Sequence, residues 1–219
     1  MKSALIIFPG SNCDRELQIA LETVGMQVER VWHKETNLPE GVDIVFLPGG
    51  FSFGDYLRPG AIAASSRILG SVVSFADKGG YIVGICNGFQ VLLEAKLLPG
   101  ALLRNKSQKF LCQDEKLIVS EIDSIFTKAF ELEEIVSFPI AHNDGNYYCT
   151  DADLDILTQN GQILFRYQVN PNGSKASVAA VCSENKRILG IMPHPERVIR
   201  SENGGQDGLK FFESIINFI

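Results

Sequence analysis

A seven-residue stretch near the middle of the chain, Gly84–Gln90, admits few backbone arrangements. The apolar run Tyr81–Val83 before it predicts a buried strand, and the apolar residues after it predict a helix. A strand, a G-x-C-x-G turn and a helix together predict a nucleophile elbow with Cys86 at its apex. Such a turn is strained and needs small neighbours, which Gly84 and Gly88 provide. It would place Cys86 at a helix N-terminus, where the helix dipole favours a thiolate. A buried structural cysteine between two loop glycines is the alternative.

The rest of the chain alternates short apolar runs with helical patterns. A parallel strand covered on both faces is expected at Ala4–Phe8, and further strands are expected at Val28–Trp32 and Val42–Leu47. This β-α-β rhythm predicts an α/β fold with an open, mainly parallel sheet and helices on both faces. Between residues 99 and 148 the runs shorten, which predicts an added antiparallel edge layer and a short helix at Ser124–Phe130. A last helix is expected to close the chain, and residues 1–219 are expected to form one domain.

Charge and cysteine content limit the class of function. The net charge is −6 and no Lys/Arg cluster occurs, so a basic footprint for nucleic acid or anionic membranes is absent. No apolar run approaches the roughly 18 residues of a membrane span. The five cysteines are odd in number and lack C-x-x-C spacing, which indicates neither a disulfide framework nor a zinc site. We therefore expect a protein of the reducing cytoplasm without a metal site.

A thiol nucleophile needs a base, and the base needs an orienting group. Among the three histidines, His194 is favoured because it follows an apolar strand within Met192–Arg197. Pro195 favours an extended backbone at the histidine, and residues two apart in extended chain point to the same side. Glu196 can then accept the second ring N–H, which predicts a Cys86–His194–Glu196 triad. A surface turn with a chance His and Glu is the alternative. In α/β-hydrolases the acid precedes the His in the sequence. Here Glu196 follows His194, which argues against that class.

Chemistry at an amide carbonyl also requires hydrogen-bond donors for the oxyanion. The N–H of Asn87 directly follows the nucleophile and is suitably placed. The N–H of Gly50 is the second candidate, because a residue without Cβ lets the backbone approach closely. Gly50 lies in a glycine-rich loop at the carboxyl end of a predicted strand, where sites form in such sheets. The loop does not match a P-loop, but Asp55 and Arg58 within it indicate a functional role.

Three motifs together resemble the class I glutamine amidotransferases. They are G-x-C-x-G-x-Q at Gly84–Gln90, P-G-G at Pro48–Gly50 and H-P-E at His194–Glu196. The resemblance implies hydrolysis of the glutamine side-chain amide through a thioester on Cys86. It also implies that Gln90 helps to hold the substrate glutamine, and that this chain carries no cofactor.

A closer resemblance spans nearly the whole chain. Gly10–Glu16, Gly49–Arg58 and Asn170–Ser174 look like the glutaminase subunits that serve the amidation of formylglycinamide ribonucleotide in purine biosynthesis. This implies two partners: a large synthetase subunit, which would bind ATP and Mg, and a small bridging subunit. The segment His142–Tyr147 departs from the family, because Asn146 stands where a basic residue is common. We assign that loop no catalytic role, and its histidine is the less favoured candidate base.

Three other functions remain open at this point. The chain could serve another synthetase, such as one that makes GMP or anthranilate, although the loop at residues 50–58 argues against this. It could be a cysteine hydrolase of the intracellular peptidase or stress-response type. Those proteins usually place the His directly after the elbow Cys or nearby, whereas Asn87 follows here. A non-catalytic interaction subunit is the last alternative, and the intact set of Cys86, His194 and Glu196 counts against it.

Overall fold

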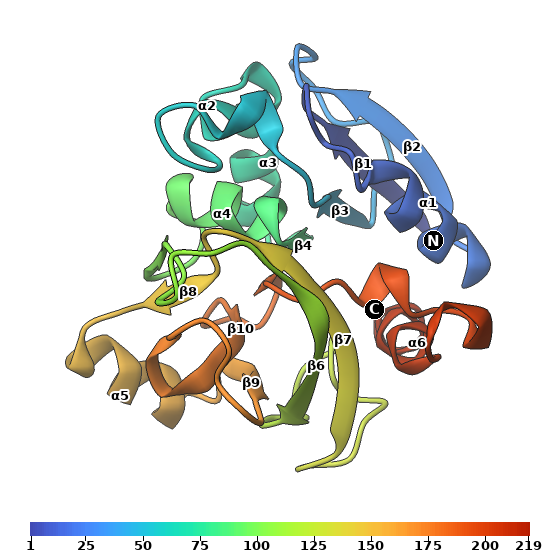
Figure 1. The fold of residues 1–219 in the computed structure, drawn as a ribbon. Helices are drawn as coiled ribbons and strands as arrows, with labels where there is room; N and C mark the ends of the chain where they lie inside the picture. The colour runs from blue at the N-terminus through green and yellow to red at the C-terminus, as the bar shows by residue number, and fades with distance from the viewer.

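The computed structural model describes residues 1–219, apart from the side chain of Asn203. A nine-stranded sheet in the order β2-β1-β3-β4-β11-β10-β9-β6-β7 runs through the molecule, and β5 pairs with β8 in a second, small sheet (Figure 1). The strands are β1 (Lys2–Ile7), β2 (Gln27–Trp32), β3 (Ile44–Leu47), β4 (Tyr81–Ile85), β5 (Ala101–Leu103), β6 (Leu111–Val119), β7 (Ile135–His142), β8 (Asn146–Tyr148), β9 (Ile163–Tyr167), β10 (Val178–Cys182) and β11 (Ile188–Ile191).

The large sheet has a parallel part and an antiparallel part. Parallel pairing joins β2, β1, β3, β4 and β11, and antiparallel pairing joins β11, β10, β9, β6 and β7. The expected parallel sheet with antiparallel strands at its edge is therefore confirmed. The antiparallel strands continue the same sheet, because β10 pairs directly with β11.

Helices cover both faces of the sheet, as expected. Helices α1 and α6, the first and last in the chain, lie on one side of the sheet, whereas α2, α3 and α4 lie together on the other side (Figure 1). Within the described residues, no helix has both the length and the apolar character that crossing a membrane requires. The helices are α1 (Asp14–Thr23), α2 (Ala61–Ala64), α3 (Arg67–Asp77), α4 (Asn87–Glu94), α5 (Asp151–Gln159) and α6 (Asp207–Phe218), and the 3-10 turns are η1 (Ser52–Asp55), η2 (Lys175–Ser177), η3 (Pro195–Arg197) and η4 (Ser201–Asn203).

Burial explains why the two parts of the sheet have different sequence patterns. All four residues of β3 are buried, as expected for a parallel strand covered on both faces. In β7, buried and partly exposed residues alternate, and Val136, Phe138, Ile140 and His142 form the buried set. Such alternation is typical of an antiparallel strand with one face on the core. His142 therefore shares its face of the sheet with Phe138, whose ring packs on Phe165.

Two local expectations differ from the structure. The short helix expected at Ser124–Phe130 is wrong: the segment forms turns in which Thr127 N donates to Ser124 O and Phe130 N donates to Thr127 O. In addition, α5 was not expected. A capping box starts that helix, with reciprocal hydrogen bonds between Thr150 and Asp153.

Candidate active site

The elbow predicted from the glycine spacing is present between β4 and α4. Cys86 has φ 50° and ψ −103°, which a residue with a side chain rarely adopts. A Cβ added to Gly84 would lie 2.6 Å from the backbone of Gly88, and one added to Gly88 would lie 2.0 Å from Leu47 O. Strand and helix can therefore meet at this turn only because both positions are glycine.

His194 and Glu196 form a buried pair. Their atoms Nδ1 and Oε1 lie 2.6 Å apart, and both side chains are almost fully enclosed. The predicted pairing is thus present, but its local cause differs: Pro195–Arg197 is a 3-10 turn, η3, and not extended chain. Since Glu196 holds Nδ1, the other ring nitrogen, Nε2, remains for chemistry. That atom is buried and has no hydrogen-bond partner among the described residues.

The charge on this pair favours a protonated imidazole. Burial alone would lower the pKa of His194, but the negative charges of Glu196 and Cys86 raise it to about 10. At neutral pH the ring is therefore held in the form that can donate a proton. A leaving nitrogen requires such a donor.

The sheet brings the thiol and the imidazole together at its carboxyl edge. β4 and β11 are parallel neighbours, with Ile85 opposite Ile191, and Cys86 N donates to Ile191 O at 2.7 Å. Cys86 and His194, the predicted nucleophile and base, therefore leave the same edge from adjacent strands, as site residues in open parallel sheets do.

The antiparallel part of the sheet closes over the same edge. β7 is the last strand of the sheet, yet Pro139 O accepts a hydrogen bond of 2.8 Å from His194 N. Two residues further along β7, Ala141 O lies 3.8 Å from Cys86 Sγ. In Figure 1, β6 and β7 are long and strongly curved, and their upper ends lie near α4 and β4.

The two expected oxyanion donors come from the elbow itself, at Asn87, and from the loop after β3, at Gly50. Among the described residues, neither Gly50 N nor Asn87 N has a hydrogen-bond acceptor. Gly50 has φ 135°, and a Cβ there would lie 2.6 Å from Gly10 O, so the position needs glycine. Ser52 N donates to Asn87 Oδ1 at 3.2 Å and fixes the loop against α4.

Gln90 lies one helical turn after the nucleophile and is already engaged within the chain. Its Oε1 accepts from Asn87 Nδ2 and its Nε2 donates to Asp144 O, each at 2.9 Å. The side chain thus connects the elbow helix to the loop that follows β7. In this arrangement Gln90 supports the walls of the site through Asn87 and Asp144.

Cys13 is a neighbour of the site that the sequence did not reveal. One donor atom each from Cys13, His194 and Glu196 lies within 4.8 Å of the others. Burial and the charge of Glu196 raise the pKa of Cys13 to about 12, so this thiol stays protonated. Arg197 Nη2 donates to its sulfur at 3.1 Å, and a guanidinium so close opposes a bound cation. We interpret Cys13 as packing behind the His–Glu pair.

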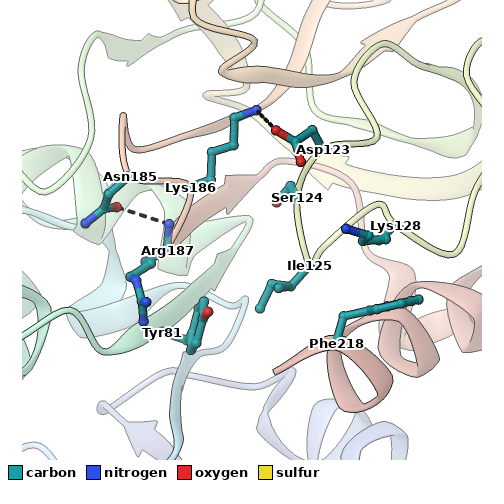
Figure 2. Close-up of a pocket in the computed structure, with 9 residues that line it drawn as sticks. All are labelled: Tyr81, Asp123, Ser124, Ile125, Lys128, Asn185, Lys186, Arg187 and Phe218. Atoms are coloured by element: carbon teal, nitrogen blue, oxygen red, sulfur yellow. Dashed lines mark hydrogen bonds and ion pairs between the residues drawn. The ribbon is translucent and has the colours of Figure 1, made fainter.

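A hollow of about 320 Å³ lies at the opposite edge of the sheet, where β4 and β11 begin (Figure 2). Two of its three cations are engaged by polar groups of the chain: Lys186 pairs with Asp123 at 3.3 Å, and Arg187 donates to Gly79 O at 2.7 Å. None of the candidate site residues predicted from the sequence lines this hollow, so we assign it no catalytic role. The lining residues are Tyr81, Asp123, Ser124, Ile125, Lys128, Asn185, Lys186, Arg187 and Phe218.

Comparison with known proteins gives consistent matches. Residues 1–208 match the family model of the CobB/CobQ-like glutamine amidotransferase domain. Two curated relatives are phosphoribosylformylglycinamidine synthase subunits PurQ. The one from Ruegeria sp. (strain TM1040) is 53% identical over 98% of this chain and 97% of its own length. The one from Cereibacter sphaeroides is 53% identical over 99% of this chain and 97% of its own length.

Solved structures agree with the sequence matches. A chain in the structure of PurLQS from Thermotoga maritima has a TM-score of 0.92 and 42% identity, and the match covers 99% of this chain and 98% of that one. The glutaminase domain of the CTPS from Trypanosoma brucei, solved with bound acivicin, has a TM-score of 0.65 at 16% identity, covering 99% of this chain and 94% of that one. The second likeness concerns the fold alone.

Proposed function

The chain belongs to the CobB/CobQ-like glutamine amidotransferase family, and from this premise we propose that Cys86, His194 and Glu196 hydrolyse the side-chain amide of glutamine. The observation that carries the proposal is the buried His194–Glu196 pair, whose Nδ1 and Oε1 atoms lie 2.6 Å apart. The pair follows β11, the parallel neighbour of the strand that leads into the elbow at Cys86. No other cysteine among the described residues combines a strained turn with a neighbouring imidazole.

The reaction follows from this geometry in two halves. The S–H proton of Cys86 passes to His194 Nε2 as Sγ attacks the carboxamide carbon, and the electron pair of the C=O bond moves onto the oxygen. The N–H groups of Gly50 and Asn87 are proposed to stabilise that oxyanion, and removal of one such donor typically costs about 3 kcal/mol. The C–N bond then breaks while His194 gives a proton to the nitrogen, and ammonia leaves a γ-glutamyl thioester.

In the second half a water molecule cleaves the thioester. His194 takes a proton from the water, the C–S bond breaks, and glutamate and the free thiol are released. Throughout both halves Glu196 holds Nδ1, so Nε2 is the nitrogen that gives and takes the proton. Gln90 is proposed to keep the substrate pocket in shape through Asn87 and Asp144.

The ammonia serves the conversion of formylglycinamide ribonucleotide to formylglycinamidine ribonucleotide in purine biosynthesis. Relatives that match almost their entire length to this chain are subunits of phosphoribosylformylglycinamidine synthase, and the Thermotoga match is a PurLQS structure. The chain therefore works with a large synthetase subunit and a small bridging subunit. This agreement favours that role over a GMP or anthranilate synthetase, a peptidase-like hydrolase or a non-catalytic subunit.

Three further points belong to the same proposal. ATP and Mg are proposed to bind the large synthetase subunit, because the sequence of this chain contains no P-loop. Residues 1–219 are proposed to act as one glutaminase domain, which the unbroken nine-stranded sheet supports. The reducing cytoplasm is proposed as the setting, since a free catalytic thiol has to stay reduced there.

Glutamine hydrolysis by purified protein, alone and with the synthetase subunits, tests the mechanism. Cys86→Ser should lower the rate by about three orders of magnitude or more. Cys112→Ser is the matched control, because that thiol is exposed and should matter little. A glutamine-derived electrophile should label Cys86. Labelling of Cys112 or Cys182 in its place, or full activity of Cys86→Ser, would overturn the assignment.

A further inference from the structure

His142 lies at the carboxyl end of β7 and is held by a polar network. Its Nδ1 is 3.0 Å from Asn105 Oδ1, and both residues are buried, at 3% and 0% exposure. The network also orients Asn105, whose Nδ2 donates to His142 O at 2.8 Å and to Lys109 O at 2.9 Å. Asn105 therefore presents its oxygen to the imidazole, and that oxygen also accepts from Gly145 N at 3.1 Å.

This network fixes the tautomer of His142. A carbonyl oxygen can only accept, so Nδ1 of the imidazole must carry the proton. In the neutral ring Nε2 is then a bare acceptor. Burial and the positive charge of His194 lower the pKa of His142 to about 4, which keeps the ring neutral at physiological pH. His142 thus complements His194: one imidazole is a charged donor, and the other is a neutral acceptor.

The acceptor on His142 has no donor in the protein. Nε2 is buried without a hydrogen-bond partner among the described residues, a condition that costs free energy unless a bound molecule relieves it. The position is close to the chemistry, because Ala141, the preceding residue, places its carbonyl oxygen 3.8 Å from Cys86 Sγ. His194 lies against the same strand, because its N–H donates to Pro139 O at 2.8 Å.

A glutamine carboxamide needs two kinds of partner. Its oxygen needs donors, which the proposed function assigns to Gly50 and Asn87. Its nitrogen needs acceptors, and none of the residues assigned so far supplies one. Resting on that proposed function, we propose that His142 Nε2 accepts a hydrogen bond from the carboxamide nitrogen of glutamine, with Ala141 O as a second acceptor beside the thiol.

This contact strengthens as the reaction proceeds. When His194 protonates the nitrogen, the group held by His142 becomes a cation, and hydrogen bonds to charged groups are stronger than neutral ones. The His142 ring is neutral and carries its proton on Nδ1. Its Nε2 therefore accepts a hydrogen bond from the protonated nitrogen, and no positive charge on the ring repels that nitrogen. The same arrangement disfavours glutamate, whose carboxylate has no N–H and would face two acceptor lone pairs. His142 therefore distinguishes substrate from product.

Two substitutions of His142 distinguish its role as a hydrogen-bond acceptor, through Nε2, from its structural contact with Asn105. In His142→Asn, the side-chain amide nitrogen can replace Nδ1 and still donate to Asn105, but nothing replaces Nε2. We expect a thermal unfolding midpoint near that of the wild type and a fall in kcat of about ten- to a hundredfold. We also expect glutamate to inhibit this variant more strongly than the wild type. In His142→Gln, the side-chain oxygen reaches the position of Nε2, so activity should be higher than in His142→Asn although the contact with Asn105 is lost.

The measurement is glutamine hydrolysis by the full chain with its synthetase subunits, together with glutamate inhibition and thermal unfolding of each variant. Wild-type kcat and glutamate inhibition in a well-folded His142→Asn protein would overturn the proposal. The proposal would also be overturned if both variants lost activity only in proportion to their loss of thermal stability. These outcomes differ from failure of the proposed function, in which the wild-type protein itself would not hydrolyse glutamine.

Discussion

At the scale of single residues, the electrostatics of the site depend on Glu196. Its charge opposes the effect of burial, which alone would lower the pKa of His194. Replacing the carboxylate by an amide keeps the shape but removes the charge. The imidazole would then lose its proton at neutral pH and with it the ability to protonate a leaving nitrogen.

We therefore predict that Glu196→Gln lowers kcat for glutamine hydrolysis by about 10²–10⁴-fold. The pH profile should change as well, because activity should recover partly at lower pH, where the imidazole regains its proton. Steady-state kinetics between pH 6 and 9 would measure both effects. Glu16→Gln is a suitable control, since Glu16 pairs with Arg197 at the surface and its loss should alter kcat less than about twofold. An unchanged pH profile in Glu196→Gln would contradict the role of the charge.

Asp55, in the glycine-rich loop, gives a second prediction, which concerns the pH dependence of folding stability. Burial and the charge of Asp144 raise the pKa of Asp55 to about 6, and its Oδ1 is buried without a hydrogen-bond partner. An acid whose pKa is higher in the folded state contributes stability below its unfolded pKa, near 3.8, and loses that contribution as pH rises through about 6. At pH 8 the ionised carboxylate therefore destabilises the fold.

Asp55→Asn should consequently raise the free energy of unfolding at pH 8 by about 1 kcal/mol and have little effect near pH 4. Urea unfolding of both proteins at the two pH values would measure the difference. The same change at pH 4 and pH 8 would show that the effect does not come from ionisation.

The sequence predicted a set of reacting residues but not the residues packed behind them. Cys86, His194 and Glu196 were predictable because short motifs require particular residue types at fixed spacing. Cys13 and Asn105 were missed, because each meets its partner only in the folded chain. Asn105 holds His142 across 37 positions of sequence, and no local pattern records such a contact.

At the scale of elements, α6 supports the catalytic turn from a distance in sequence. Gly208 N donates to Val198 O at 3.0 Å, and a Cβ on Gly208 would lie 1.8 Å from Pro195 O. The helix can approach η3 this closely only because a glycine stands there. The position of Glu196 thus depends on the first turn of α6.

Gly208→Ala should therefore displace η3, lower the free energy of unfolding by about 1–3 kcal/mol and reduce kcat at least tenfold. Gly70→Ala is the matched control, because Gly70 lies within α3 and a Cβ there would meet nothing within 4 Å. In that variant stability should rise slightly and kcat should not change. Thermal unfolding and glutaminase assays would compare the two. Equal behaviour of the two alanine variants would refute the close-packing argument.

Elements with a strong periodic pattern were predictable, and elements stabilised by distant partners were not. The continuous apolar runs of β1, β3 and β4 revealed the parallel sheet, since strands covered on both faces have no polar side. The strands β5 and β8 have three residues each and exist because Ala101 pairs with Tyr148 across the chain. α5 buries a single residue, Leu157, so its apolar pattern is weak. Its start signal, Thr150 followed by Asp153, was nevertheless present in the sequence.

At the scale of the whole molecule, the function divides between subunits. This chain makes ammonia, and the synthetase uses it. Loss of the thiol should stop the supply of ammonia without harming the step that consumes it. We predict that a complex carrying Cys86→Ser loses glutamine-dependent amidation of formylglycinamide ribonucleotide but retains amidation with added ammonium chloride.

Product formation with each nitrogen donor, at equal concentrations of ATP, would measure this division. Glutamine-dependent synthesis should fall by about three orders of magnitude, and ammonium-dependent synthesis should stay within about twofold of the wild type. Loss of both activities would show that Cys86 is needed for assembly of the complex.

The pairing of β4 with β11 also governs the order in which the site can form during synthesis. Ile82 lies opposite Ile188, so β4, which pairs with β3 on one side, gains its second neighbour only after about a hundred more residues have been added. At roughly 5–20 residues per second, this interval is about 5–20 s on the ribosome. Until then the nascent chain holds Cys86 without His194, and β4 is an unpaired edge that invites wrong pairing. A fragment that ends before β11 therefore has the Cys86 thiol but lacks His194, the proposed base, and we expect it not to hydrolyse glutamine.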